Sequence, residues 1–308
     1  MKIAITGGTG FVGTRLVQKL QADDQDILVF TRDVVRSRRI FPAAAFPRVE
    51  LVAYQPLAAG DWQTRISGCA AVVNLAGESL ADGRWTPARK QAIIDSRQLG
   101  TRRLVEAIQQ AEPKPQVLVS ASAVGYYGTS ETAVFTETSP PGDDFLAEIC
   151  QTWEAEAQAV KAAGVRLAIA RIGIVLGNGG AIAKLIPPFK LFAGGPIGSG
   201  QQWFSWIYRD DLVDLIWQMI QRPDFAGVYN ATAPNPVRMQ ELCATLGQLL
   251  QRPSWLPVPA FAIEALLGDA AMIVLEGQRA LPEATQAAGF QYQQATVKSA
   301  LAAVLAET

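Results

Sequence analysis

Three glycines near the start of the chain have the spacing of a turn that binds a dinucleotide. Gly7, Gly10 and Gly13 form a G-x-x-G-x-x-G pattern after the strand-like run KIAIT and before apolar residues at helical spacing. The first glycine permits a tight turn, the second lets backbone N–H groups approach a pyrophosphate, and the third lets helix and strand pack closely. The predicted cofactor site comprises this turn and its neighbours, namely Gly7, Thr9, Gly10, Phe11, Val12 and Gly13.

The residue that follows the second strand-like segment, 27–31, indicates which dinucleotide is preferred. An NAD site usually carries an acidic residue there, which accepts hydrogen bonds from the ribose hydroxyls. This chain has Arg32 instead, and a guanidinium presents a planar fork that matches a 2′-phosphate. We therefore predict NADP (NADPH) as the cofactor. Two alternatives stay open: a solvated basic patch with Arg38 and Arg39, and a ribose contact from Asp33.

The charge balance argues against several classes of partner. The 308 residues include 27 basic and 28 acidic side chains, and no basic run is longer than a few residues. Such a chain has no electrostatic footprint for nucleic acid or for an anionic membrane surface. We therefore expect a small-molecule substrate, with neither nucleic acid nor membrane as a partner.

Histidine and cysteine usage limits the chemistry and the compartment. The chain has no histidine, and its three cysteines, Cys69, Cys150 and Cys243, lie far apart, so we expect no metal site. Any acid or base must be Tyr, Lys, Cys, Asp, Glu or a cofactor. Strand-like sequence begins at Lys2, without room for a signal peptide, and apolar runs stop short of about 20 residues. These features predict a reducing, cytoplasmic location.

The elements that must position these residues alternate between strand and helix. Helical patterns at 96–111 and 210–222 lie between apolar, β-branched runs. Strands covered by helices on both faces are typical of a parallel sheet. We predict an α/β Rossmann fold with a doubly wound parallel sheet of about seven strands. These strands are expected near residues 2–6, 27–31, 48–52, 71–75, 116–121, 166–171 and 227–231.

The alternation breaks at 178–206 and again after residue 233, where the sequence is apolar and rich in proline or glycine. We expect these segments to form a smaller, interleaved C-terminal substrate lobe over the carboxyl ends of the strands, where open α/β sheets bind ligands. Residues 1–170 would form the NADP-binding Rossmann domain, with a returning segment at about 205–232. Residues 171–308 would mainly bind the substrate.

Several motifs together resemble a known family. They are the glycine turn, NLAGE at 74–78, SASAVGYYG at 120–128, RIGIVLG at 171–177 and WIYRDDL at 206–212. This set is similar to the extended short-chain dehydrogenase/reductases, and more narrowly to an atypical subgroup, the YfcH-type epimerase family. The resemblance implies an NADP-binding Rossmann protein, and some members carry a cell-division-inhibitor name. It also implies that the backbone of Leu75 and Ala76 lines the adenine side of the cofactor.

The chain departs from that family at its catalytic helix. Enzymes of the wider group use a Y-x-x-x-K pair, in which Tyr is the acid or base and Lys holds the nicotinamide ribose. Aligned on Glu154, the pair falls on Leu146 and Cys150 in the segment FLAEICQTWE. Leu146 has no proton to give, and a cysteine is neutral unless a positive charge depresses its pKa. The sequence therefore predicts that the standard proton donor is absent.

Two residues are candidates for the catalytic role. Ser122 matches the family's catalytic serine, at the end of the fifth strand; the alternative is a serine that satisfies a strand-end backbone group. Tyr126, in the loop just beyond, has a phenol that could donate a proton during hydride transfer. Packing at the lobe interface is the alternative for Tyr126 or for its neighbour Tyr127.

Two charged residues complete the predicted cofactor site. Glu78 follows the NLAG segment directly and is placed to reach the cleft. Arg97 occupies the position where the wider group has a structural Asn, and an arginine there could bind a phosphate or a substrate carboxylate. The alternative is a surface arginine that pairs with Asp95 or Glu78.

These observations favour an NADP(H)-binding oxidoreductase or a nucleotide-sugar-epimerase-like protein. Its small-molecule substrate is unknown, and a nucleotide-linked substrate is one alternative. The alternative is a non-catalytic cofactor-binding protein that engages a protein partner, with cell division as one setting. The retained glycine turn supports both hypotheses. The missing Tyr and Lys favour the second, and the polar loop GGPIGSGQQW at 194–203 favours a ligand-binding cleft.

Overall fold

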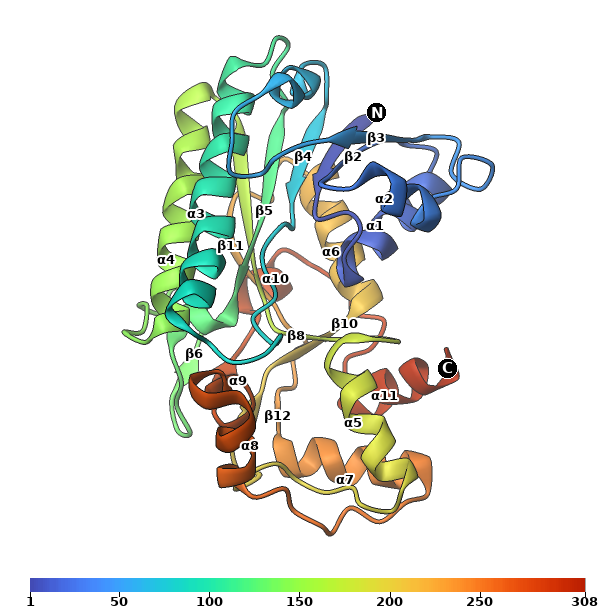
Figure 1. The fold of residues 1–308 in the computed structure, drawn as a ribbon, viewed down its shortest axis with the longest axis vertical. Coiled ribbons are helices and arrows are strands. Elements are labelled where there is room, and N and C mark those ends of the chain that lie inside the picture. The colour runs from blue at the N-terminus through green and yellow to red at the C-terminus, as the bar shows by residue number, and fades with distance from the viewer. Residues whose placement is uncertain (308) are drawn as a thin grey trace.

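The computed structural model describes residues 1–307 and contains one parallel sheet of seven strands in the order β11-β7-β5-β4-β1-β2-β3 (Figure 1). The strands are β1 Lys2–Thr6, β2 Asp26–Thr31, β3 Val49–Ala53, β4 Ala71–Asn74, β5 Val117–Ala123, β7 Arg166–Ile172 and β11 Gly227–Ala231. The predicted doubly wound sheet is confirmed. Its strand order reverses between β1 and β4, so the crevice for a ligand lies beyond the carboxyl ends of these strands.

Helices cover both faces of the sheet (Figure 1). One face packs against α1, α2 and α6 through Leu16, Leu20 and Leu212, and the other packs against α3, α4 and η1 through Trp62, Leu104 and Ala157. Their bounds are α1 Phe11–Ala22, α2 Val34–Ile40, η1 Asp61–Ile66, α3 Pro87–Gln110, α4 Phe145–Gln158, η3 Ala159–Ala163 and α6 Arg209–Gln221.

Local sequence explains where the helices around the crevice begin. Thr86 accepts a hydrogen bond from the backbone N–H of Arg89 at the start of α3, with Pro87 as the first helical residue. Asp144 caps α4 in the same way, accepting from the N–H of Ala147. By contrast, the N-cap residue of α1 is Gly10, which has no side chain to cap the helix. The free N–H groups at the start of α1 are therefore available to an anion.

A smaller lobe lies beyond the carboxyl ends of the strands, in the lower half of Figure 1. Its core includes Ile186, Trp206, Leu246 and Leu301 and is separate from the two cores of the sheet. Strand β11 returns to the main sheet between segments of this lobe. The lobe contains β8 Ile174–Leu176, α5 Gly180–Lys190, β9 Trp203–Phe204, β10 Trp206–Tyr208, β12 Val237–Arg238, α7 Met239–Leu250, α8 Ala260–Leu267, η4 Gly268–Ala271, α9 Met272–Leu275 and α11 Val297–Ala306. The remaining short elements are η2 Val124–Tyr127, β6 Val134–Phe135, β13 Arg279–Ala280 and α10 Glu283–Ala287.

Helix α5 was not expected from the sequence, because Pro187 and Pro188 lie inside it. Proline normally breaks a helix, since it lacks an N–H and its ring clashes with the preceding turn. Here the buried side chains of Ile182, Ile186 and Phe189 hold the helix against the core of the smaller lobe. Tertiary packing therefore overrides the local signal.

Candidate functional site

The glycine turn has the geometry that the motif predicts. Gly7 has a φ of +71°, and a Cβ at that position would lie 2.6 Å from the backbone carbonyl carbon of Leu75. A Cβ on Gly13 would lie 2.2 Å from the carbonyl oxygen of Gly7. Neither position tolerates a side chain, and the β1 turn lies directly against the 75–76 segment that follows β4. The backbone N–H groups at the start of α1 are therefore placed beside the crevice between β1 and β4.

Arg32, which follows β2, forms an ion pair with Glu78, which follows β4. The Arg32 guanidinium contacts Glu78 Oε1 at 3.0 Å, and Arg89 contacts Glu78 Oε2 at the same distance. The hydrogen bond from Arg32 lowers the pKa of the Glu78 carboxyl below its usual range. The Arg32 side chain is 68% exposed, so it is free to accept a further anion. Asp33 instead caps α2, accepting from the N–H of Arg36 at 2.9 Å.

A cavity of about 190 Å³ lies beyond the carboxyl ends of β5 and β7. Its walls come from α3, α4, β5, β7 and the smaller lobe, including Ala123, Ile172, Trp203 and Met272. Leu146 and Cys150, the residues at the positions of the missing Tyr and Lys, also line it. The cavity is therefore lined by the two positions at which the resemblance places the Y-x-x-x-K pair.

Leu146 and Cys150 make this wall apolar. Leu146 belongs to a hydrophobic cluster that joins the starts of α3 and α4 to α8 and α9, with Trp85, Ile149 and Met272 among its members. Cys150 is buried, and its thiol lies 3.6 Å from the carbonyl oxygen of Ala123. Burial raises the pKa of Cys150 to about 11, with the charge of Glu154 as a further cause. The thiol is therefore neutral at physiological pH.

This environment predicts an unreactive cysteine at position 150. At pH 8 a thiol with the ordinary pKa of about 8.5 is roughly one-quarter ionised, whereas one with a pKa of about 11 is roughly 0.1% ionised. Iodoacetamide should therefore alkylate Cys150 at least roughly 200-fold more slowly in the folded protein than in urea. Mass spectrometry of the labelled peptides measures this ratio. Rapid labelling of the native protein at pH 8 would instead indicate an activated thiolate.

Ser122 belongs to a buried charged network rather than standing free beside the cavity. Its hydroxyl donates to Glu154 Oε1 at 2.7 Å, and Arg171 donates to both oxygens of Glu154 at 2.8 Å. Ser122, Glu154 and Arg171 are 3%, 8% and 4% exposed. The single hydroxyl proton of Ser122 is thus donated to the Glu154 carboxylate. The Ser122 oxygen can therefore only accept a hydrogen bond from a ligand.

The same network reaches the tyrosine pair in η2. The Arg171 guanidinium lies 3.3 Å from the centre of the Tyr126 ring and donates to the Tyr127 hydroxyl at 3.0 Å. Tyr127 in turn donates to Asn230 of β11 at 2.6 Å, and burial raises the pKa of Tyr127 to about 12. Within residues 1–307 the Tyr126 hydroxyl forms no hydrogen bond. The Tyr127 hydroxyl is therefore occupied by hydrogen bonds within the protein, whereas the Tyr126 hydroxyl proton is available to a ligand.

Arg97 is buried and lines the cavity. It is not a surface arginine paired with Asp95 or with the Glu78 carboxylate, which were the alternatives. Its Nη1 donates instead to the backbone carbonyl oxygens of Glu78 at 3.0 Å and Ile93 at 3.3 Å. The guanidinium also lies 5.1 Å from the centre of the Trp153 ring.

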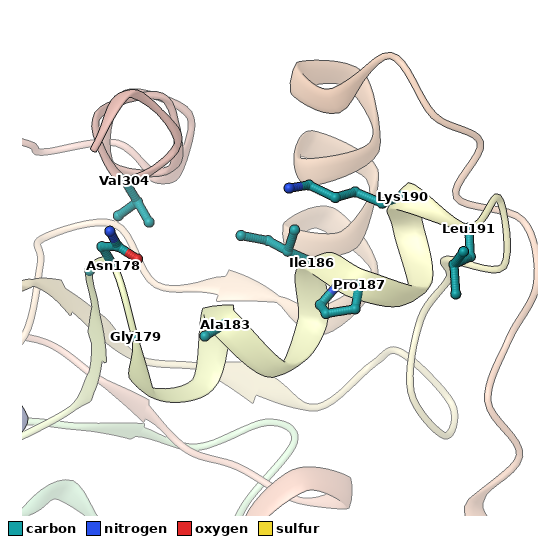
Figure 2. A pocket seen from close by; sticks show the side chains of 9 residues that line it. Asn178, Gly179, Ala183, Ile186, Pro187, Lys190, Leu191 and Val304 are labelled. Atoms are coloured by element: carbon teal, nitrogen blue, oxygen red, sulfur yellow. The ribbon is translucent and has the colours of Figure 1, made fainter. Parts of the chain in front are cut away.

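A second cavity, of about 440 Å³, lies along α5 in the smaller lobe (Figure 2). Figure 2 shows Asn178 and Val304 at one end of it and Lys190 at the other, with Ile186 between them. The Asn178 amide is already bonded to the backbone of Glu307 at 3.0 Å. Most of the lining is aliphatic, and Lys190 and Leu191 are exposed. The lining of the smaller cavity, in contrast, includes the buried guanidinium of Arg97.

Family models match most of the chain. The model for the NAD dependent epimerase/dehydratase family matches residues 3–232, which span the parallel sheet. The chain belongs to this family. A second model, a domain of unknown function (DUF1731), matches residues 258–304 in the smaller lobe. The resemblance that the sequence motifs indicated is confirmed.

Individual relatives cover the whole chain. The chloroplastic epimerase family protein SDR39U1 homolog of Arabidopsis thaliana is 51% identical over 99% of this chain and 87% of its own length. The epimerase family protein YfhF of Bacillus subtilis is 38% identical over 100% of this chain and 99% of its own. The crystal structure of human SDR39U1 (isoform 2) with NADPH superposes with a TM-score of 0.88, at 33% identity and full coverage of both chains.

The structure brings most of the predicted site residues to one crevice. The glycine turn, Leu75, Ala76, Arg32 and Glu78 lie around the ends of β1, β2 and β4, and Arg97 lines the cavity beside them. Ser122 and Tyr126 lie next to the cavity, joined through Arg171. Sequence reasoning missed the roles of Glu154, Arg171 and Asn230. Arg171 opens the motif RIGIVLG, but nothing in its spacing reveals its partner.

No helix within residues 1–307 combines the length and the hydropathy needed to cross a bilayer.

Proposed function

We propose that this chain is an NADP(H)-dependent oxidoreductase, or an epimerase-like enzyme, that acts on a small molecule. One observation supports this most: a glycine turn without side-chain caps faces the same crevice as a cavity whose lining includes the buried Arg97. When bound, NADPH would supply a hydride to the substrate. The three buried free cysteines support a reducing, cytoplasmic location.

The proposal assigns a role to each region. The backbone N–H groups at the start of α1 hold the pyrophosphate, Arg32 binds the 2′-phosphate, and Glu78 positions Arg32. The backbone at Leu75 and Ala76 lines the adenine side. Residues 1–170, with the returning segment 205–232, would bind the cofactor, and residues 171–308 would mainly bind the substrate. Ser122 and Tyr126 are the proposed catalytic residues.

Cofactor preference tests this assignment. We expect NADPH to bind roughly ten- to hundredfold more tightly than NADH, because a bidentate charge-assisted contact contributes about 1.5 to 3 kcal/mol. Arg32→Asp should remove or reverse the preference. Isothermal titration calorimetry with both cofactors measures it.

Arg48→Asp is the matched control. Arg48 contacts Asp24 and Asp26 near the amino end of β2, whereas Arg32 follows the carboxyl end of the same strand. The substitution changes the charge by the same amount but should leave the NADPH preference intact. Equal affinities of the wild type for the two cofactors would refute the role of Arg32.

A second candidate function is a non-catalytic cofactor-binding protein that engages a protein partner, with cell division as one setting. Helix α8 supports it, because none of its residues is buried and Phe261 and Leu266 are 72% and 69% exposed. Ligand mapping by NMR distinguishes the two functions. Shifts around Ser122, Tyr126 and residues 194–204 would support the enzyme, and shifts confined to residues 255–281 would support the partner-binding protein.

A further inference from the structure

Arg97 is a buried cation without a counter-ion. It is 9% exposed, yet it forms no ion pair with any carboxylate of residues 1–307. The acceptors of its Nη1 are the carbonyl oxygens of Glu78 and Ile93 and, at 3.5 Å, the Ser96 hydroxyl, all of them neutral. Burying a guanidinium without a negative partner costs free energy, which an anionic ligand would offset.

The neighbouring charges increase this excess of positive charge. The Glu78 carboxylate lies close in sequence to the Gly77 backbone that packs on Arg97, but it is held by Arg32 and Arg89. The cluster therefore contains three arginines and one glutamate. Glu154, on α4, is paired with Arg171. Within residues 1–307, no carboxylate is therefore left to form an ion pair with Arg97.

Arg97 lies against the segment that follows β4. A Cβ at Gly77 would lie 3.0 Å from Arg97 Cζ, and the guanidinium faces Trp153 of α4. It is therefore placed between the segment after β4 and helix α4, whereas the turn that would hold the pyrophosphate follows β1. Arg97 lines the same cavity as Ala123 of β5, and the sheet order puts β5 and β1 on opposite sides of β4.

The cavity beside Arg97 is compact and largely apolar. Leu146, Ile149, Trp203 and Ile273 are among its lining residues. Its volume is about 190 Å³. The buried indole Nε1 of Trp153, in the same lining, is a donor without a partner in the described chain. A sugar ring, with hydroxyls on most carbons, would leave many polar groups unpaired against such walls.

We propose that Arg97 binds the carboxylate of the substrate, and that the substrate is a compact carbonyl acid whose apolar body fills the cavity. The inference rests on the proposed function and narrows its substrate class. Of the two roles that its sequence position suggested, a phosphate contact and a substrate-carboxylate contact, it assigns Arg97 to the second. Arg97 and the Trp153 indole supply donors only, which suits an anion with several acceptor oxygens.

Binding to the NADP⁺-loaded protein tests the proposal. The probes are three 2-oxo acids, namely pyruvate, 4-methyl-2-oxopentanoate and phenylpyruvate, together with their uncharged methyl esters. At least one acid is expected to bind roughly ten- to hundredfold more tightly than its ester, as for a charge-assisted hydrogen bond to arginine. Equal affinity of each acid and its ester, or no binding by any acid, would overturn the proposal.

Variants locate the acid on Arg97. Arg97→Met should abolish the difference between acid and ester, and Arg97→Lys should retain part of it. The control is Arg103→Met, on the same helix, where Arg103 pairs with Glu106 at the protein surface. The NADPH affinity of each variant is titrated separately. Loss of NADPH affinity in Arg97→Met as large as the loss for the acid would assign Arg97 to the cofactor and overturn the proposal. Failure of the wild type to bind NADPH would instead refute the proposed function.

Discussion

Arg171→Met is expected to lower the free energy of unfolding by about 3 to 5 kcal/mol. The substitution removes the counter-ion of Glu154, a carboxylate that is only 8% exposed, and leaves its charge buried. It also removes a hydrogen bond to the Tyr127 hydroxyl. Equilibrium unfolding in urea, followed by tryptophan fluorescence, measures the change.

Two further variants separate the ion pair from the loss of packing. Arg102→Met breaks an exposed ion pair with Glu156, which lies on α4 like Glu154; Arg102 Nε and Glu156 Oε2 are 3.0 Å apart. This substitution should lower the free energy of unfolding by at most about 1 kcal/mol. The double substitution Arg171→Met with Glu154→Leu removes both charges of the pair and should recover most of the lost stability. If the double variant is as unstable as Arg171→Met, the cost lies in packing and the charge argument is wrong.

The sheet was predictable because its signals are local. Each central strand is a short apolar run whose residues face helices on both sides, so the run itself identifies it. Gly7 and Gly13 are likewise identified by their spacing, since each is needed where a backbone approaches within 3 Å of the would-be Cβ. Helix α5 shows the limit, because Pro187 and Pro188 argue locally for a loop and only its packing holds it helical.

The connections within the site were not predictable, because they join residues far apart in the chain. Ser122 and Glu154 are separated by 32 positions and Tyr127 and Asn230 by 103, and no periodicity relates them. Ser122 could be proposed as catalytic from its motif alone. Only the structure shows that its hydroxyl proton is directed to Glu154. The direction of a proton depends on partners that tertiary structure supplies.

Turnover of a carbonyl substrate with NADPH is expected to fall roughly 10² to 10⁴-fold in Tyr126→Phe, which is the usual contribution of a general acid. The other candidate acids beside the cavity are poor, since the Ser122 proton is directed to Glu154 and the pKa of Cys150 is about 11. The Tyr126 hydroxyl has no partner within residues 1–307, and its chain neighbours Val124 and Gly125 line the cavity.

The substitution isolates the proton, because phenylalanine keeps the ring that packs on the Arg171 guanidinium at 3.3 Å. NADPH affinity and thermal stability should therefore stay within about threefold and about 1 kcal/mol of the wild type. Tyr229→Phe is the matched control, because the Tyr229 hydroxyl makes only long contacts, at 3.3 and 3.4 Å, near the amino end of the sheet. Stopped-flow measurement of NADPH oxidation gives kcat for all three proteins. A Tyr126→Phe variant that turns over as fast as Tyr229→Phe would exclude Tyr126 as the acid and leave the proton to come from water or from the substrate.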